Sequence, residues 1–77
     1  MKWEGDKGFK EIITEEGYHL KVKYKESHNA YWWGAFKDGQ IIYVSQPDDY
    51  KKTLSGAQKA AQQRMIRDIL DEGQRSE

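Results

Sequence analysis

The chain has 77 residues, no cysteine, and a formal net charge of zero from 13 basic and 13 acidic residues. The lack of cysteine excludes disulfides and thiolate metal sites. The opening MKWEGDKG has no apolar core of the kind a signal peptide needs, and the run AYWWGAF is far shorter than the ~20 residues that cross a bilayer. These observations predict a cytoplasmic protein with no membrane partner.

A chain of this length is expected to form a single domain over residues 1–77, with its core in residues 9–72 and frayed ends. Three Trp, five Tyr and two Phe residues argue for a packed core, because each ring can bury ~150–250 Å². The charges are segregated: residues 18–37 and 51–64 are net positive, whereas residues 1–17 and 38–50 are net negative. A neutral chain can therefore still present a cationic patch.

In chain order, the segment FKEIITEEG can supply a first strand, with Glu16-Gly17 as a turn that places Ile13 beside Leu20. Residues 18–25, YHLKVKYK, alternate strictly between apolar and basic side chains, which predicts a strand with one buried face. Residues 31–37 and 40–45 are also strand-like. Asp38-Gly39 between them is typical of a two-residue hairpin turn.

These hairpins define an expected register. With ESHN as one loop, Val22 lies opposite Trp33, and with Asp38-Gly39 as the other, Trp33 lies opposite Val44. Since opposed residues share a face, one face carries an apolar set: Leu20, Val22, Tyr24, Trp33, Ala35, Ile42 and Val44. The other face carries the lysine row with several rings: His19, Lys21, Lys23, Lys25, Trp32, Gly34, Phe36, Ile41 and Tyr43.

The C-terminal segment predicts an amphipathic helix. Ser55 and Gln58 fit a capping box at its start, and Gly73 suits the left-handed position after its last turn. The apolar residues at helical spacing are Leu54, Ala57, Ala61, Met65 and Ile69, widened by Ile66 and Leu70. The expected fold class is therefore α+β, a three- or four-stranded antiparallel meander with one C-terminal helix packed on one face.

A meander followed by a helix opening SGAQKAAQQ resembles the C-terminal part of a double-stranded-RNA-binding domain, over residues 18–70. The family's lysine cluster at this helix start is represented by Lys59. The outline is also similar to AP2-type and phage-integrase arm-binding domains, and to small β-β-β-α proteins of phage and bacteria. The resemblance implies the fold and, through the AP2 and integrase-arm families, nucleic-acid contact by the exposed sheet face.

The helix can cover only one face of the sheet, so the candidate binding residues lie on the other: His19, Lys21, Lys23, Lys25, Trp32, Phe36 and Tyr43. Exposed rings beside cations usually mark a contact site. We expect a protein partner, with nucleic acid as the alternative. A third interpretation is that the N-terminal segment folds over this face through Trp3, Phe9 and Ile12, with lysine stems packed on the rings.

Signals for catalysis are weak. Ser27-His28 suggests a nucleophile and a base, but adjacent polar residues suit a hairpin loop. His19 and His28 lack metal-ligand spacing, and Gly34 marks a bulge or a close approach within a strand. The sequence thus predicts a small non-enzymatic binding module, similar to a phage accessory or inhibitor protein, with no cofactor and no metal; its oligomeric state stays open.

Overall fold

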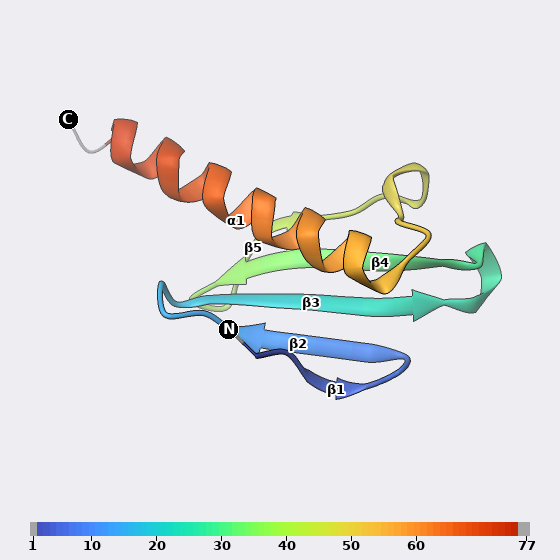
Figure 1. The fold of residues 1–77 in the computed structure, drawn as a ribbon. Helices are drawn as coiled ribbons and strands as arrows, with labels where there is room; N and C mark the ends of the chain where they lie inside the picture. The colour runs from blue at the N-terminus through green and yellow to red at the C-terminus, as the bar shows by residue number, and fades with distance from the viewer. Residues whose placement is uncertain (1, 76–77) are drawn as a thin grey trace.

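The computed structural model describes residues 2–75, which form a five-stranded antiparallel sheet with one helix on one face (Figure 1). The strands pair in chain order, β1-β2-β3-β4-β5. Their bounds are β1 Glu4–Asp6, β2 Phe9–Ile13, β3 Tyr18–Lys25, β4 Ala30–Lys37 and β5 Gln40–Val44, and the helix α1 spans Leu54–Arg75. The α+β prediction is confirmed, with five strands in place of three or four.

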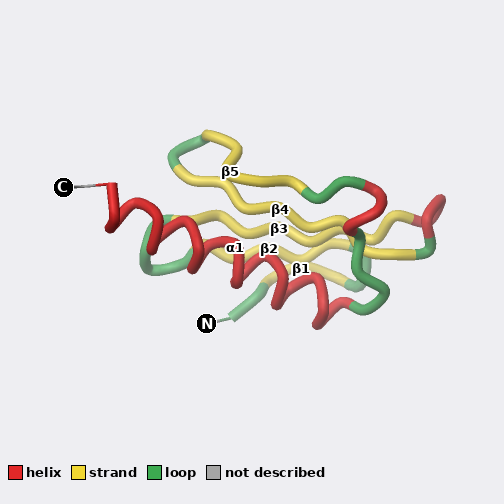
Figure 2. The backbone as a smooth tube through the Cα atoms, turned by 90° about the horizontal axis from the view of Figure 1, so that it is seen from above, coloured by secondary structure: helices red, strands yellow, loops and turns green. Residues whose placement is uncertain are grey.

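The two layers leave one side of the sheet uncovered. Helix α1 packs over β3 and β4, and Figure 2 shows it on one side of the sheet only. Ala57 and Ala61 are fully buried, so their small side chains let the helix lie close to the strands. The principal extents are 43 × 25 × 20 Å, those of an elongated two-layer body. We call the side of the sheet turned away from α1 the open face.

The register between β3 and β4 is as predicted, with Val22 opposite Trp33 and Tyr24 opposite Tyr31. Tyr18, Leu20 and Val22 have no exposed surface and form the centre of the core. The alternation in β3 fixes the register because one side of the strand is apolar and the other is basic. A shift of one residue would bury lysines against the helix. Local periodicity was sufficient to place this strand.

The register of β5 departs from the prediction after its first two residues. Ile41 lies opposite Phe36, as expected, but the next pair joins Tyr43 to Ala35 because Ile42 is an extra residue in a bulge. The extra residue reverses the parity of the rest of the strand. Tyr43 therefore packs against the core on the helix side, and Val44, opposite Gly34, faces the open side.

The first hairpin is also shifted by one residue from the expected pairing. Ile12, not Ile13, lies opposite Leu20, because Thr14 pairs with Tyr18 and only three residues turn the chain between them, the last being Gly17 with a φ of 91°. The Thr14 hydroxyl accepts a hydrogen bond from the Tyr18 amide at 3.1 Å and closes this loop. Ile12 is consequently buried in the core, while Ile13 points to the open face and is 73% exposed.

The N-terminal segment widens the sheet and does not fold over it. Strand β1 pairs with β2, and Trp3 packs against the core that lies between sheet and helix. Phe9 reaches the open face only as a member of β2, opposite Lys23. The expectation that this segment covers the open face through Trp3, Phe9 and Ile12 is wrong, because the backbone forms an additional hairpin. The sequence predicted frayed chain ends. Part of that prediction falls on residues 1, 76 and 77, which lie outside the described residues.

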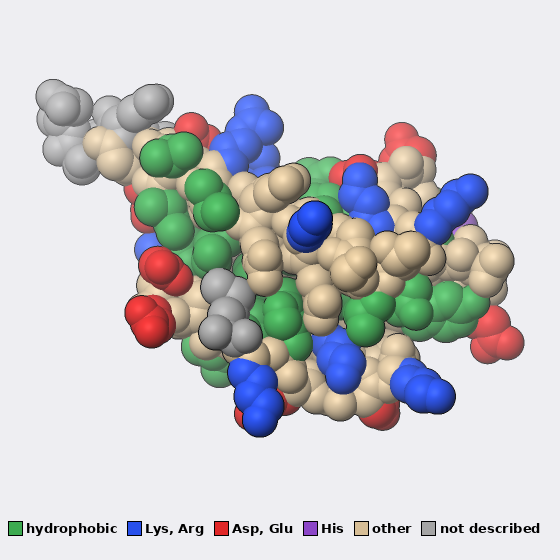
Figure 3. Space-filling view, viewed as in Figure 1, with side chains coloured by type: hydrophobic (Ala, Val, Ile, Leu, Met, Phe, Trp, Pro, Cys, Tyr) green, Lys and Arg blue, Asp and Glu red, His purple; other side chains and the backbone are tan. Residues whose placement is uncertain are grey.

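Helix α1 begins two residues earlier than the capping box predicted. The Thr53 hydroxyl accepts a hydrogen bond from the Gly56 amide at 3.0 Å, so Thr53 is the N-cap and Ser55 lies inside the first turn. Gly73 lies within the helix and does not end it. Ile66 and Leu70, expected to widen the buried arc, are 51% and 62% exposed. Apolar side chains gather over the C-terminal half of α1 in Figure 3.

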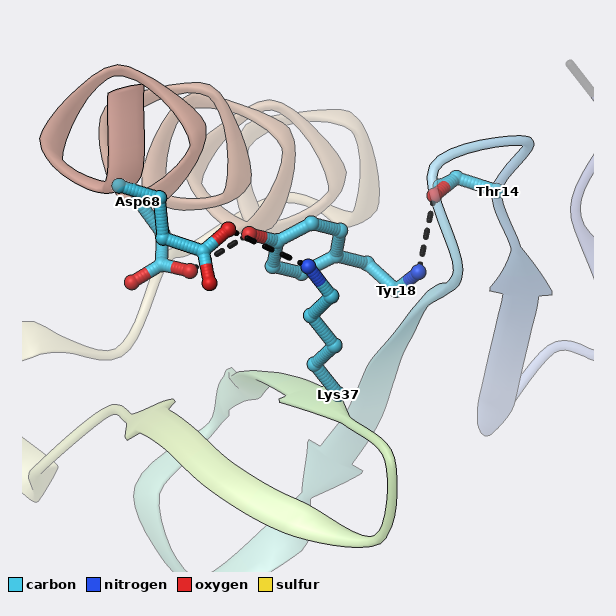
Figure 4. Close-up of polar contacts among 5 residues, drawn as sticks. Thr14, Tyr18, Lys37 and Asp68 are labelled. Carbon is cyan, nitrogen blue, oxygen red and sulfur yellow. Dashed lines mark hydrogen bonds and ion pairs between the residues drawn. The ribbon is translucent and has the colours of Figure 1, made fainter. Parts of the chain in front are cut away.

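Tyr18 links the sheet to the C-terminal half of the helix (Figure 4). Its hydroxyl donates a hydrogen bond to Asp68 at 2.5 Å, and the Lys37 ammonium lies 4.8 Å from the centre of its ring. Lys37 also forms an ion pair with Glu72 at 3.2 Å. Burial, followed by the hydrogen bond to Asp68, raises the pKa of the Tyr18 hydroxyl well above its ordinary value.

Among residues 2–75, no helix combines the length and the apolar character needed to cross a membrane.

Candidate functional site

The open face carries six of the seven predicted binding residues. His19, Lys21 and Lys23 lie along β3 opposite Phe36, Gly34 and Trp32 of β4, and Lys25 continues the row. Because directly opposed residues share a face, the structure brings together the four β3 side chains and the two rings of β4. Tyr43 is the seventh residue and does not join them.

Trp32 and Phe36 form a ring pair over a glycine. Their ring centres are 6.4 Å apart with planes inclined by 43°. A Cβ added to Gly34, between them in the strand, would lie 2.9 Å from Trp32 Cη2 and 3.2 Å from Phe36 Cε1. Gly34 thus marks a close approach, as the sequence suggested, and the approaching groups are the rings of its own strand.

Lys21 extends this ring pair with a cation. Its ammonium lies 5.2 Å from the centre of the Phe36 ring, a distance suited to a cation–π interaction. We refer to Lys21, Trp32 and Phe36 together as the aromatic cluster. Its rings are half-buried by one another and by the sheet, so their orientation is set before any partner arrives.

The apolar surface continues from the aromatic cluster onto β5. Ile41, opposite Phe36, is 66% exposed, and Val44, opposite Gly34, is half-buried on the same face. No element within residues 2–75 packs across these side chains (Figure 2). A large β-branched residue left in water beside two rings is the kind of surface that contacts a partner.

An acidic strip borders the lysine row on its other side. Glu11 of β2 lies on the open face opposite Lys21, and Glu4 of β1 lies opposite Glu11. The Glu11 carboxylate is 2.6 Å from His19 Nε2, and both side chains are partly exposed. The open face therefore runs from an edge on β1 and β2, where Glu4 and Glu11 lie with Phe9 and Ile13, through the basic row of β3 to the aromatic and aliphatic side chains of β4 and β5.

Tyr43 lies on the opposite side of the sheet from the aromatic cluster. Its ring centre is 5.1 Å from that of Trp33, its hydroxyl donates a hydrogen bond to Asp49 at 3.0 Å, and the Arg64 guanidinium lies 5.0 Å from its ring centre. The hydrogen bond to Asp49 is the main reason that the pKa of Tyr43 is raised. The prediction of Tyr43 on the open face is wrong because the bulge at Ile42 reverses its orientation.

The Ser27-His28 pair lies in a short exposed 3₁₀ turn. Ser27 Oγ is 3.0 Å from His28 Nδ1, and the His28 ring packs edge-on against Tyr50. The ion pairs found among the described residues do not include His28, so none of their carboxylates is paired with its ring. Within residues 2–75, no three His, Asp or Glu side chains converge as metal ligands.

Sequence reasoning missed three open-face residues: Phe9, Ile13 and Val44. A glycine with positive φ at the end of a three-residue loop is a recognised hairpin pattern, so Gly17 could have indicated the shift that exposes Ile13. No comparable signal exists for Val44. Ile41 and Ile42 are chemically identical, and neither one marks itself as the extra residue of the bulge.

Comparisons of the chain with protein-family models, with curated proteins and with solved structures gave no match. The resemblance to double-stranded-RNA-binding, AP2-type and integrase arm-binding domains accordingly stays a prediction.

Proposed function

We propose that the protein is a small non-enzymatic binding module that engages a protein partner through its open face. Trp32, Phe36 and Ile41 are the apolar anchors of the interface, and Lys21, Lys23 and Lys25 belong to its polar surroundings. A role similar to that of a phage accessory or inhibitor protein is compatible with such a module. The cytoplasmic location expected from the sequence stays a prediction.

The observation that carries this proposal is the preformed apolar surface on β4 and β5. Trp32 and Phe36 are held against each other over Gly34, beside an Ile41 that is 66% exposed. Interface hot spots are commonly aromatic residues near the centre of a patch, surrounded by polar groups that exclude water. Fixed rings lose little conformational entropy on binding, so they suit this use.

The charge pattern favours a protein over a nucleic acid. A nucleic-acid strand that follows the lysine row would also meet Glu4 of β1 and Glu11 of β2, and these carboxylates repel phosphates. The Phe36 ring is already approached by Lys21, and the two rings are inclined to each other, so they do not offer parallel surfaces for successive bases. A protein surface with an apolar centre and mixed charges matches all three strips.

One observation favours nucleic acid as the second candidate. Lys21, Lys23 and Lys25 form a row along β3 next to Trp32, which is the combination of cations and rings that single strands require. Lys37 does not belong to this row, because it lies on the helix side and pairs with Glu72. Three phosphate contacts would give a log–log salt slope of about −2 to −3.

The proposal is tested by comparing Trp32→Ala and Phe36→Ala with Ile66→Ala, an exposed apolar residue on α1. Amide-shift mapping of the labelled protein against cell-lysate fractions locates the responding face, and calorimetry with the purified partner then measures affinity. We expect each ring variant to weaken binding by about 2 kcal/mol. We expect Ile66→Ala to bind like the parent chain.

Gly34→Ala tests the arrangement of the rings without removing them. The nearest atoms to the new methyl group would be the ring ends of Trp32 and Phe36 and no backbone atom, so the rings move apart while the fold persists. We expect an altered Trp32 indole signal and weaker binding in a chain that unfolds at nearly the same denaturant concentration. Unchanged affinity in all three open-face variants would refute the proposed anchors, and binding of single strands with the salt slope given above would replace the protein partner by a nucleic acid.

A further inference from the structure

A second surface, on the helix side of the sheet, forms a polar groove. It lies where α1, β5 and the turn after β5 meet, and its volume is about 490 Å³. The lining includes Trp33 and Tyr43 from the sheet, Asp49 and Lys51 from the turn, and Arg64 and Arg67 from the helix. Figure 3, which views the molecule from the helix side, shows several Lys and Arg side chains projecting from this side of the molecule.

The groove has an excess of positive charge. Lys51, Arg64 and Arg67 face a single lining carboxylate, Asp49. That carboxylate is already engaged, since Oδ2 accepts the Tyr43 hydroxyl at 3.0 Å and Oδ1 lies 3.6 Å from the Lys51 ammonium. Asp48, the neighbouring acid, is exposed and lies outside the lining. The ion pairs formed within residues 2–75 include neither arginine.

Arg64 is held in place although no acid within residues 2–75 forms an ion pair with it. Its guanidinium lies over the Tyr43 ring at 5.0 Å, and that ring is fixed by Trp33 and by the bond to Asp49. Its Nε atom is buried and has no hydrogen-bond partner among the described residues. A guanidinium stacked on a ring can still present its two terminal Nη groups to a bidentate acceptor. Residues 2–75 thus immobilise a charged fork, and no ion pair among them supplies an anion to it.

We propose that this groove binds the dianionic phosphate of a phosphomonoester, held by Arg64 and Arg67 with Lys51 at the side. The two arginines are three residues apart on one helix, so their side chains are neighbours. A phosphate dianion offers three oxygens to two forks and matches the excess of positive charge, which a single carboxylate does not. The Tyr43 ring is already occupied by Arg64 and Trp33, so recognition is directed at the phosphate and not at an attached base.

The test uses the three tryptophan indole N–H signals of the full-length chain, assigned by Trp→Phe substitution. Trp33 Nε1 donates to the Asp49 carbonyl at 3.1 Å and lines the groove, whereas Trp32 lies on the open face. Inorganic phosphate, O-phosphoserine and adenosine monophosphate are the probes, with acetate at equal ionic strength as the control. We expect all three phosphates to shift the Trp33 signal saturably and to leave the Trp32 signal in place.

Arg64→Gln and Arg67→Gln should each weaken phosphate binding about tenfold or more, because each removes a charge-assisted contact. Arg67 is exposed, so its variant keeps the core intact, and Lys59→Gln is the matched control from the same helix outside the groove. Stronger binding of one phosphoester than of inorganic phosphate would identify the source of the group. An equal response to acetate, or phosphate binding that survives in Arg67→Gln, would overturn the proposal.

This site does not depend on the open face. The Trp32 and Trp33 signals report on opposite sides of the sheet, so failure of either site is seen separately from the other.

Discussion

At the scale of single residues, Tyr18 shows how one buried side chain connects distant parts of this chain. Its amide bonds to Thr14 in the loop before β3, its hydroxyl bonds to Asp68 on α1, and its ring receives the Lys37 ammonium from β4 (Figure 4). The ring is fully buried, yet its hydroxyl has a charged acceptor, so burial carries no unsatisfied donor.

Removing this hydroxyl has an effect that depends on pH. Tyr18→Phe should destabilise the chain by about 1–2 kcal/mol near pH 7, because a hydrogen bond to a carboxylate is lost. The folded-state pKa of Tyr18 is raised above its ordinary value of 10.0, so this contribution is fully present below pH 10 and declines as the pH rises further. Urea unfolding of both chains at increasing pH measures the difference.

The difference in the free energy of unfolding between the parent chain and Tyr18→Phe should therefore become smaller above pH 10. A difference that stays constant would contradict the hydrogen bond between Tyr18 and Asp68 as its cause. Tyr24→Phe is the matched control near neutral pH, since the Tyr24 hydroxyl donates to the uncharged side chain of Asn29 on the exposed surface. Tyr24→Phe should lower the free energy of unfolding by less than Tyr18→Phe does.

At the scale of elements, the boundaries depend on side chains that the periodic pattern does not include. Thr53 precedes the first apolar residue of α1 and is its N-cap, although Ser55-Gln58 matches a capping box equally well by composition. After η2 (Pro47–Asp49), Lys51 pairs with Tyr31 of β4 through two backbone hydrogen bonds, which anchors the chain just before the helix. That anchor leaves Thr53 where its hydroxyl can reach the Gly56 amide.

The two candidate caps are distinguished by alanine substitution. Thr53→Ala should lower the free energy of unfolding by about 1 kcal/mol, because the Gly56 amide loses its acceptor. Ser55→Ala, at an exposed position inside the first turn, should change it by less than about 0.5 kcal/mol. Chemical unfolding followed by helical circular dichroism measures both, and the reverse order would restore the capping box.

At the scale of the whole molecule, one helix and one sheet leave two different surfaces. The helix lies over β3 and β4, and the spacing between the layers is set by Ala57 and Ala61, which have no exposed surface. The uncovered side carries the aromatic cluster, and the groove beside α1 carries Arg64 and Arg67, which join none of the ion pairs formed within residues 2–75. The two proposed sites share strand β4 through Trp32 and Trp33, whose side chains point in opposite directions.

The layer spacing predicts a strong penalty for a larger residue at its centre. Ala61→Leu should destabilise the chain by about 1–3 kcal/mol, because the added methylenes have no free volume to fill. Lys59→Leu, on the exposed side of the same helix, is the matched control, because Lys and Leu have similar helix propensities. Thermal unfolding compares the two, and equal melting temperatures would show that the layers can separate without cost.

Much of this fold could be predicted because β3 is unambiguous. Its apolar and basic sides differ at every position, so Val22 against Trp33 follows from alternation alone. The strand β1 was missed because EGD carries no apolar pattern. Gly5 within it has a φ of 130°, a backbone conformation that favours glycine. The site residues on β3 and β4 were placed correctly for the same reason, whereas the placement of Tyr43 failed with the bulge.

The sequence by itself determined the order of the elements, the buried side of β3 and β4, and the uncovered surface with its lysines and rings, because side-chain alternation and helical spacing are local properties. Only the tertiary structure decided on which side Tyr43 lies, and with it the groove in which Arg64 meets Tyr43 and Asp49. The physical reason is that a single extra residue in β5 changes few local preferences, while it changes the direction of every side chain that follows.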